Sequence, residues 1–135
     1  MTTGSLRVLL VEDSAVLADR LSELLNHVPG VTLVDKVDTE SAAVGVVRSQ
    51  SIDVMILDLH LRQGTGLGVL RSLADEPHGA VAIVLTNYAL PQYRRAASDL
   101  GVRYFLDKAR EFERIPDVLR EIADAASRHD QADAT

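Results

Sequence analysis

Three carboxylates, those of Glu12, Asp13 and Asp58, stand directly behind runs of apolar residues. Residues 8–11 precede the first two, and residues 54–57 precede the third. In a parallel sheet the carboxyl ends of the strands share one edge, where such sheets keep their chemistry. Three anions at one edge repel each other unless a cation lies among them, and carboxylate oxygens suit a hard cation such as Mg²⁺. The spacing therefore predicts a Mg²⁺ site built from these three residues.

Two further side chains are expected at the same edge. Thr86 follows the apolar residues 81–85, and Lys108 follows the apolar residues 102–106. A carboxylate can attack a phosphoryl group to give an acyl phosphate, while a metal, an ammonium group and a hydroxyl group neutralise the oxygens around the phosphorus. We predict that Asp58 is the attacking carboxylate and that Thr86 and Lys108 are neutralising groups.

The chain alternates short apolar runs with segments of helical periodicity, which is typical of βα units around a parallel sheet. Five such units fit, so we predict an α/β fold with a five-stranded parallel sheet. Strands are predicted at residues 6–11, 31–37, 54–57, 81–85 and 102–106.

The predicted helices each carry one apolar stripe. The first begins at a cap on Asp13 or Ser14 and ends at Pro29-Gly30. Three more are predicted from about residue 39 to 49, from 66 to 75, and from Pro91 to the glycine at 101. The fifth follows Pro116, with an inward stripe of Val118, Leu119, Ile122 and Ala126. Residues 127–135 are polar and lack periodicity, so we predict one domain over residues 1–126 and a disordered tail after it.

The composition narrows the class of protein. With 135 residues, 47% of them hydrophobic, the chain suffices for one domain with a buried core. The net charge of −6 argues against a general nucleic-acid-binding surface and favours protein or small-molecule partners. The absence of cysteine excludes disulfides and thiolate metal sites, and the sequence shows neither a signal peptide nor a membrane span. We therefore expect a cytoplasmic protein.

Four strings of the sequence carry a resemblance to a known family. They are Val11-Glu12-Asp13-Ser14, Leu57-Asp58-Leu59, Leu85-Thr86-Asn87 and Phe105-Leu106-Asp107-Lys108. Each is common alone, but in this order the set resembles the response regulator receiver domain, the CheY-like family of two-component signalling, over roughly residues 6–126. The resemblance implies a flavodoxin-like three-layer sandwich with strand order 2-1-3-4-5, for which a member of this family is a standard example.

By this resemblance, Asp58 accepts a phosphoryl group from the phosphohistidine of a sensor histidine kinase or a histidine phosphotransfer protein. Glu12, Asp13 and Asp58 bind Mg²⁺, and the backbone carbonyl of His60 completes the metal shell. Mg²⁺-dependent self-phosphorylation from a phosphodonor and autodephosphorylation are implied, so the protein is not a conventional enzyme.

The resemblance also implies a switch. Thr86 and Lys108 hold phosphoryl oxygens, and the family pairs this hydroxyl residue with the aromatic residue three places before the lysine, here Phe105. When Thr86 moves toward the phosphoryl group, the aromatic ring swings inward and the face of the fourth helix, fifth strand and fifth helix changes. A downstream protein effector would read that face, without direct nucleic-acid or membrane contact. The assembly could be a homodimer.

The sequence departs from the commonest family pattern at several positions. Ala109 stands where proline usually gives a cis peptide bond after the lysine, and Arg62 replaces a frequent proline. Asn87 stands where a small residue usually gives the phosphodonor access, and Tyr88 follows at a position that affects water access. These two departures bear on the rates of phosphorylation and hydrolysis. Gly64-Thr65-Gly66 keeps the glycine-rich turn of the family.

Several other functions share some of these sequence features. No output segment follows the fifth predicted helix, so we expect a stand-alone receiver, with an excised receiver of a longer DNA-binding regulator as the alternative. A phosphatase of the haloacid-dehalogenase type also uses an aspartyl phosphate, but it needs Asp-x-Asp after the first strand, where this chain has Glu12-Asp13-Ser14-Ala15. A flavodoxin-like cofactor binder would need a Ser/Thr/Gly-rich phosphate loop after the first strand, which is missing.

Simpler explanations exist for single residues. Asp13 alone suits a helix cap, Lys108 alone a surface charge, and Phe105 alone the core. The segment from Gly64 to Gly68 suggests a phosphate cradle, but its spacing fits neither a P-loop nor a dinucleotide motif, so a turn is predicted. For the arginines of the last third we favour a solvated face over a partner-binding patch; they are Arg94, Arg95, Arg103, Arg110 and Arg114.

Overall fold

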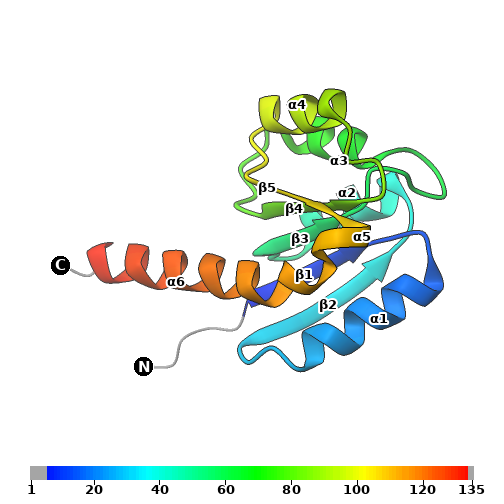
Figure 1. Cartoon of the computed structure of the whole chain (residues 1–135). Helices are drawn as coiled ribbons and strands as arrows, with labels where there is room; N and C mark the ends of the chain where they lie inside the picture. Colours follow the sequence, from blue (N-terminus) through cyan, green and yellow to red (C-terminus); the bar gives the residue numbers. More distant parts are fainter. Residues whose placement is uncertain (1–5, 134–135) are drawn as a thin grey trace.

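The computed structural model describes the backbone of residues 6–133 and the side chains of residues 6–127. Five strands form one parallel sheet in the order β2-β1-β3-β4-β5 (Figure 1). They are β1 Leu6–Val11, β2 Val31–Val37, β3 Val54–Leu57, β4 Val81–Thr86 and β5 Tyr104–Asp107. The predicted α/β fold and the strand order implied by the resemblance are confirmed.

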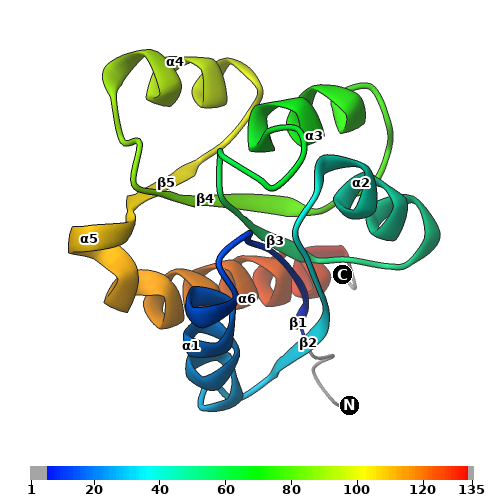
Figure 2. The ribbon, with the colours of Figure 1, turned by 90° about the vertical axis from the view of Figure 1, so that its right-hand side faces the viewer.

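Helices cover both faces of the sheet, which makes three layers (Figure 2). Helices α1 and α6 lie on one face, and α2, α3 and α4 lie on the other. The helices are α1 Ala15–Asn26, α2 Glu40–Ser49, α3 Gly66–Leu73, α4 Pro91–Asp99, the short α5 Lys108–Glu111, the 3-10 turn η1 Phe112–Arg114, and α6 Ile115–Asp133. Within the described residues, no helix combines the length and apolar character that crossing a membrane requires.

Strand β1 shows why the apolar runs of this chain are continuous rather than alternating. Val8 and Leu10 belong to the core beneath α1 and α6, whereas Leu9 and Val11 belong to the core beneath α2 and α3. All four side chains are fully buried. A central strand of a parallel sheet buries both faces, so every position along it is apolar until the strand ends.

The strand register brings the candidate site residues to one edge of the sheet. Val11 pairs with Leu57 across β1 and β3, so the residues that follow them leave the sheet at the same level. The N–H of Asp58 donates to the carbonyl of Val11 at 3.0 Å, which ties these two strand ends together. On the other side of β3, the pairing of Thr86 with Asp107 places Lys108 just beyond the end of β5.

Hydroxyl side chains cap the N-termini of α1, α2 and α3. The Ser14 hydroxyl accepts the N–H of Leu17 at the start of α1, which confirms the predicted cap. Thr39 caps α2 and Thr65 caps α3 in the same way. These caps satisfy backbone N–H groups that no helical carbonyl can reach, so each helix begins directly behind its strand or loop.

The segment after β5 differs from the prediction. Strand β5 begins at Tyr104, two residues later than expected, and Lys108 opens the unpredicted helix α5. The Asp107 carboxylate accepts the N–H of Ala109 at 2.8 Å and so caps this turn. The described peptide bonds are all trans, so the bond before Ala109 lacks the cis geometry that the family's proline usually gives.

Helix α6 also differs from the prediction. Its backbone continues to Asp133, through residues that we assigned to a polar tail, while residues 134 and 135 lie outside the described part of the chain. No glycine or proline follows Pro116, so nothing in the sequence stops the helix. Val118, Leu119 and Ile122 are buried as predicted, but Ala126 is exposed because the helix has run past the edge of the sheet (Figure 1). The division at residue 126 stays a prediction.

Candidate functional site

The three predicted carboxylates meet at the carboxyl edge of the sheet. Glu12, Asp13 and Asp58 each offer an oxygen, and these oxygens all lie within 4.8 Å of one another. Glu12 and Asp58 are buried, with 5% and 6% of their surfaces exposed, whereas Asp13 is exposed to solvent. Oxygens on opposite sides of a Mg²⁺ ion lie about 4 Å apart, and Mg²⁺ usually keeps several waters beside one or two carboxylates. The donor set therefore fits Mg²⁺, with Asp13 on the side open to water.

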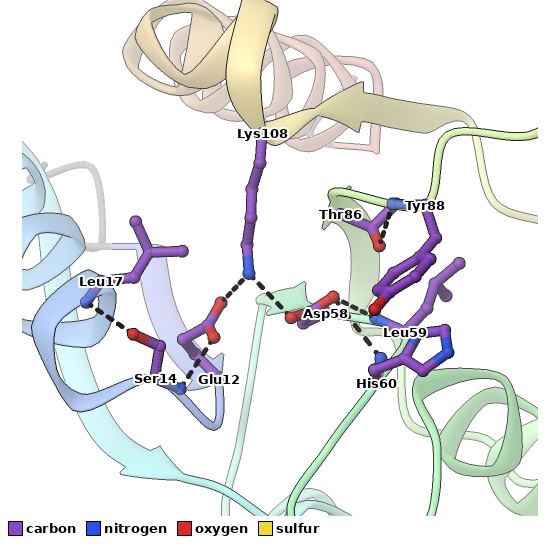
Figure 3. A network of polar contacts seen from close by, with 9 residues as sticks. All are labelled: Glu12, Ser14, Leu17, Asp58, Leu59, His60, Thr86, Tyr88 and Lys108. Atoms are coloured by element: carbon purple, nitrogen blue, oxygen red, sulfur yellow. Dashed lines mark hydrogen bonds and ion pairs between the residues drawn. The ribbon is translucent and has the colours of Figure 1, made fainter.

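The Lys108 ammonium group bridges the two buried carboxylates (Figure 3). Its Nζ lies 2.8 Å from Oε1 of Glu12 and 2.7 Å from Oδ2 of Asp58. Only about 10% of the Lys108 side chain is exposed, so solvent screens these contacts poorly. The remaining Glu12 oxygen accepts the N–H of Ser14 at 3.0 Å, so each oxygen of Glu12 has a donor.

Burial and the charged neighbours in this cluster shift two pKa values. Burial raises the pKa of Glu12, and the nearby Asp58 charge adds to this effect, although Lys108 and the Ser14 N–H act in the opposite direction. Burial alone would lower the pKa of Lys108, but its hydrogen bonds to Asp58 and Glu12 outweigh burial and raise the pKa. The lysine is thus held charged. A further cation beside Glu12 would favour its ionised form, which also suits a metal site.

Backbone N–H groups of the loop after β3 hold the Asp58 carboxylate in place. The N–H of Leu59 donates to Oδ1 of Asp58 at 2.7 Å, and the N–H of His60 approaches the same oxygen at 3.5 Å. A Cβ built on Gly66 would collide with the carbonyl oxygen of Asp58, so the loop returns to the strand end too closely for any other residue. This close return gives the predicted glycine-rich turn a specific structural reason.

Thr86 lies beside Asp58, on the side away from Glu12 (Figure 3). Its side chain is fully buried, and its hydroxyl oxygen accepts the N–H of Tyr88 at 3.1 Å. The Tyr88 ring stacks on the His60 imidazole, with ring centroids 3.8 Å apart. Tyr88 and His60 are both exposed, so this pair of rings forms an outer cover beside the Asp58 loop.

Phe105 lies half-buried on β5, with β4 between it and β3, the strand that Asp58 follows. Its ring packs against the small core cluster of Leu59, Val84 and Ala97. The Arg94 guanidinium from α4 lies over the same ring, 4.7 Å from its centroid. The predicted switch residue therefore packs against a cluster that includes Leu59 of the Asp58 loop, and it contacts Arg94 of α4.

Most of the predicted site residues come together, and several contacts were not predicted. Glu12, Asp13, Asp58 and Lys108 form one cluster, and Thr86 and the backbone of His60 lie next to Asp58. Sequence reasoning missed the N–H groups of Ser14 and Leu59, because backbone donors leave no residue-type signal. It also missed the stack of Arg94 on Phe105. These two residues are eleven positions apart and lie on different elements, so no periodic pattern connects them.

An open groove of about 560 Å³ lies beside Lys108. It runs between α1, the loop after β4 and the turn formed by α5 and η1, and Arg20 and Arg110 are among its lining residues. The Arg20 guanidinium lies over the Phe112 ring at 4.8 Å, which gives this wall of the groove a fixed positive charge. The groove leaves Lys108, alone among the charged residues of the cluster, in its lining.

Comparisons with known proteins agree with this arrangement. The sequence model of one protein family, the response regulator receiver domain, matches residues 8–120 of this chain. The transcriptional regulatory protein DesR of Bacillus subtilis is 31% identical over 115 residues, which make up 85% of this chain and 57% of DesR. A protein-glutamate methylesterase/protein-glutamine glutaminase of Anaeromyxobacter dehalogenans is also 31% identical, over 95% of this chain and 38% of that protein.

The fold has close structural neighbours as well. A DNA-binding response regulator of the LuxR family from Staphylococcus aureus superposes with a TM-score of 0.80 at 20% identity, covering 87% of this chain and 98% of that one. At this identity the likeness shows the fold alone. The chain spans about half the length, or less, of the curated relatives that it matches.

Proposed function

Since the chain belongs to the response regulator receiver domain family, we propose that its Asp58 accepts a phosphoryl group from a phosphohistidine. The donor would be a sensor histidine kinase or a histidine phosphotransfer protein. The strongest support is the convergence of Glu12, Asp13 and Asp58 within 4.8 Å, with the Lys108 ammonium 2.7 Å from Asp58. No simpler role for single residues requires this convergence.

Glu12, Asp13, Asp58 and the backbone carbonyl of His60 would hold the Mg²⁺ ion. When bound, the ion neutralises charge on the phosphoryl oxygens and aligns them for transfer. The buried Glu12 and Asp58 give the site its fixed geometry, whereas the exposed Asp13 leaves it open to ion exchange with solvent.

In the transfer, an oxygen of Asp58 forms a bond to phosphorus while the bond from phosphorus to the donor imidazole nitrogen breaks. The electron pair of the broken bond returns to that nitrogen. Lys108, already in contact with Asp58, neutralises one phosphoryl oxygen. The Thr86 oxygen accepts the N–H of Tyr88, which leaves its hydroxyl proton free to donate to another phosphoryl oxygen.

The output would pass through the face formed by α4, β5 and α6. Thr86 and Phe105 form the switch that links Asp58 to this face, and a downstream protein would read the change. Support comes from the packing of Phe105, which lies against the cluster of Leu59, Val84 and Ala97 and beneath the Arg94 guanidinium of α4. A ring in this position can pass a movement of Thr86 on to α4.

Labelling with acetyl phosphate tests this function. With Mg²⁺, the intact protein is expected to gain a single phosphoryl group by mass spectrometry, and chelation of Mg²⁺ should prevent the gain. Asp58→Asn should abolish the adduct, because the amide is a poor nucleophile. Asp53→Asn, at the opposite end of β3, is the matched control and should label normally. An adduct that persists in Asp58→Asn would refute the assignment.

A further inference from the structure

The glycine-rich segment from Gly64 to Gly68 encloses an acidic side chain from another helix. Oε1 of Glu40, the first residue of α2, accepts the N–H of Thr65 at 3.0 Å. A Cβ built on Gly64 or on Gly68 would collide with the Glu40 side chain. The two glycines thus leave the space that the Glu40 carboxylate fills, and the cradle suggested by the sequence holds an anion of the protein itself.

Glu40 is part of a wider attachment between the start of α2 and the loop after β3. Its own N–H donates to the carbonyl of Gln63 at 2.9 Å, and the N–H of Arg62 donates to the carbonyl of Asp38 at 3.0 Å. Arg62 and Asp38 also form a side-chain ion pair, but both side chains are largely exposed, so this pair adds little. Of the side chains in this attachment, Glu40 is the one that fills the space left by Gly64 and Gly68.

The same loop carries the residues of the phosphoryl site. Thr65 pairs with His60 in an antiparallel bridge, and the N–H of Gly66 donates to the carbonyl of Leu59 at 2.9 Å. Gly66 in turn lies against the carbonyl of Asp58. A displacement of Thr65 would therefore move the backbone of both His60 and Asp58.

We propose that Glu40 is a positioning residue for the phosphoryl site. By accepting the N–H of Thr65 within the space between Gly64 and Gly68, it fixes the loop that presents Asp58 and the backbone carbonyl of His60. The inference rests on the proposed function to the extent that these two groups bind Mg²⁺. Outer contacts that orient ligands typically change metal affinity by roughly 10- to 100-fold when they are removed.

The first test measures the Mg²⁺ dissociation constant from backbone amide shifts by NMR, with no phosphodonor present. Glu40→Ala should weaken Mg²⁺ binding by roughly 10-fold or more. Glu40→Gln keeps an oxygen that can accept the Thr65 N–H and should restore most of the affinity. Equal losses in Glu40→Ala and Glu40→Gln would overturn the proposal, because the effect would then come from the lost charge rather than from the hydrogen bond.

Glu76→Gln is the matched control for general loosening of α2. Glu76 forms a bidentate ion pair with Arg48. Arg48 lies in the last turn of α2, whereas Glu40 is its first residue. This variant should leave Mg²⁺ affinity unchanged. A loss as large as that of Glu40→Ala would contradict a specific role for Glu40.

Gly68→Ala provides a second, independent variant. The added methyl group should expel the Glu40 carboxylate, so Mg²⁺ binding should weaken as in Glu40→Ala. Alanine favours a helix more than glycine does, so a loss of helix stability would not explain this result. The double variant Glu40→Ala/Gly68→Ala should be no weaker than either single variant, because both remove the same contact. Additive losses would refute the shared cause.

Two outcomes separate this inference from the proposed function. If wild-type protein takes no phosphoryl group from acetyl phosphate but the Mg²⁺ results stand, the positioning role survives and the proposed function fails. If Asp58 is labelled normally but Glu40→Ala binds Mg²⁺ like wild type, the positioning role fails alone. Faster hydrogen exchange at the amides of Thr65 and Gly66 in Glu40→Ala should accompany the weaker binding.

Discussion

Lys108 sets the electrostatic balance of the site with a single ammonium group. It faces two buried carboxylates, so the cluster of Glu12, Asp58 and Lys108 carries one net negative charge when all three groups are ionised. Burial of charge is costly unless each group is paired and hydrogen-bonded, and these groups are. The raised pKa of Lys108 means that the stability it contributes is present at neutral pH and is lost only as the pH rises through that pKa.

Glu12 gives the site a pH dependence of a definite sign. Its pKa is raised above the ordinary 4.5, so the folded state binds this proton more readily than the unfolded chain does. The stability linked to Glu12 is therefore fully present below that ordinary value and is lost as the pH rises through the raised pKa. Metal binding has the opposite preference, because a carboxyl group must lose its proton to bind a metal.

We therefore expect Mg²⁺ affinity to fall as the pH is lowered from neutral, and to begin falling at a higher pH than it would for exposed carboxylates. NMR titration with Mg²⁺ at a series of pH values measures this. In Glu12→Gln the affinity should be weaker throughout and should lack the step in pH. A step that persists in Glu12→Gln would assign it to another group, and a flat profile in wild-type protein would contradict the raised pKa.

At the scale of elements, the carboxyl edge of the sheet was predictable and the turn after β5 was not. Glu12, Asp13 and Asp58 follow continuous apolar runs, and such runs reveal both the strands and their ends. The short helix α5 and the turn η1 carry no apolar stripe, because the residues from Lys108 to Arg114 are mostly charged. Their conformation depends on the Asp107 cap, which composition alone does not single out.

The loop after β4 contributes a cover that can control water access. Tyr88 stacks on His60 beside the Asp58 loop, and Tyr88 as a whole is 44% exposed. Tyr88→Ala removes this cover, so we expect hydrolysis of the Asp58 acyl phosphate to speed up several-fold. Tyr88→Phe keeps the ring and should behave like wild type. Decay of the adduct, followed by mass spectrometry after removal of acetyl phosphate, measures both rates, and a slower decay in Tyr88→Ala would contradict the covering role.

At the scale of the whole molecule, the sheet divides the core into two parts with different roles. One part, beneath α1 and α6, joins buried residues of four strands to the helix that extends past the sheet edge. The other, beneath α2, α3 and α4, supports the loops that surround Asp58. The apolar pattern predicted βα units around a parallel sheet, and the family resemblance implied the three layers. Neither predicted the extent of α6, because the residues beyond the sheet edge have no core contact to impose a pattern.

The most direct test of the phosphoryl site is a crystal structure of the protein with Mg²⁺ and beryllofluoride, which mimics a phosphoryl group. We expect beryllium bonded to an Asp58 carboxylate oxygen, with Lys108 and Thr86 on its fluorine atoms. The Mg²⁺ ion should contact Glu12 or Asp13, Asp58 and the backbone carbonyl of His60. Beryllofluoride bound elsewhere, or Mg²⁺ without contact to any of these carboxylates, would contradict the account.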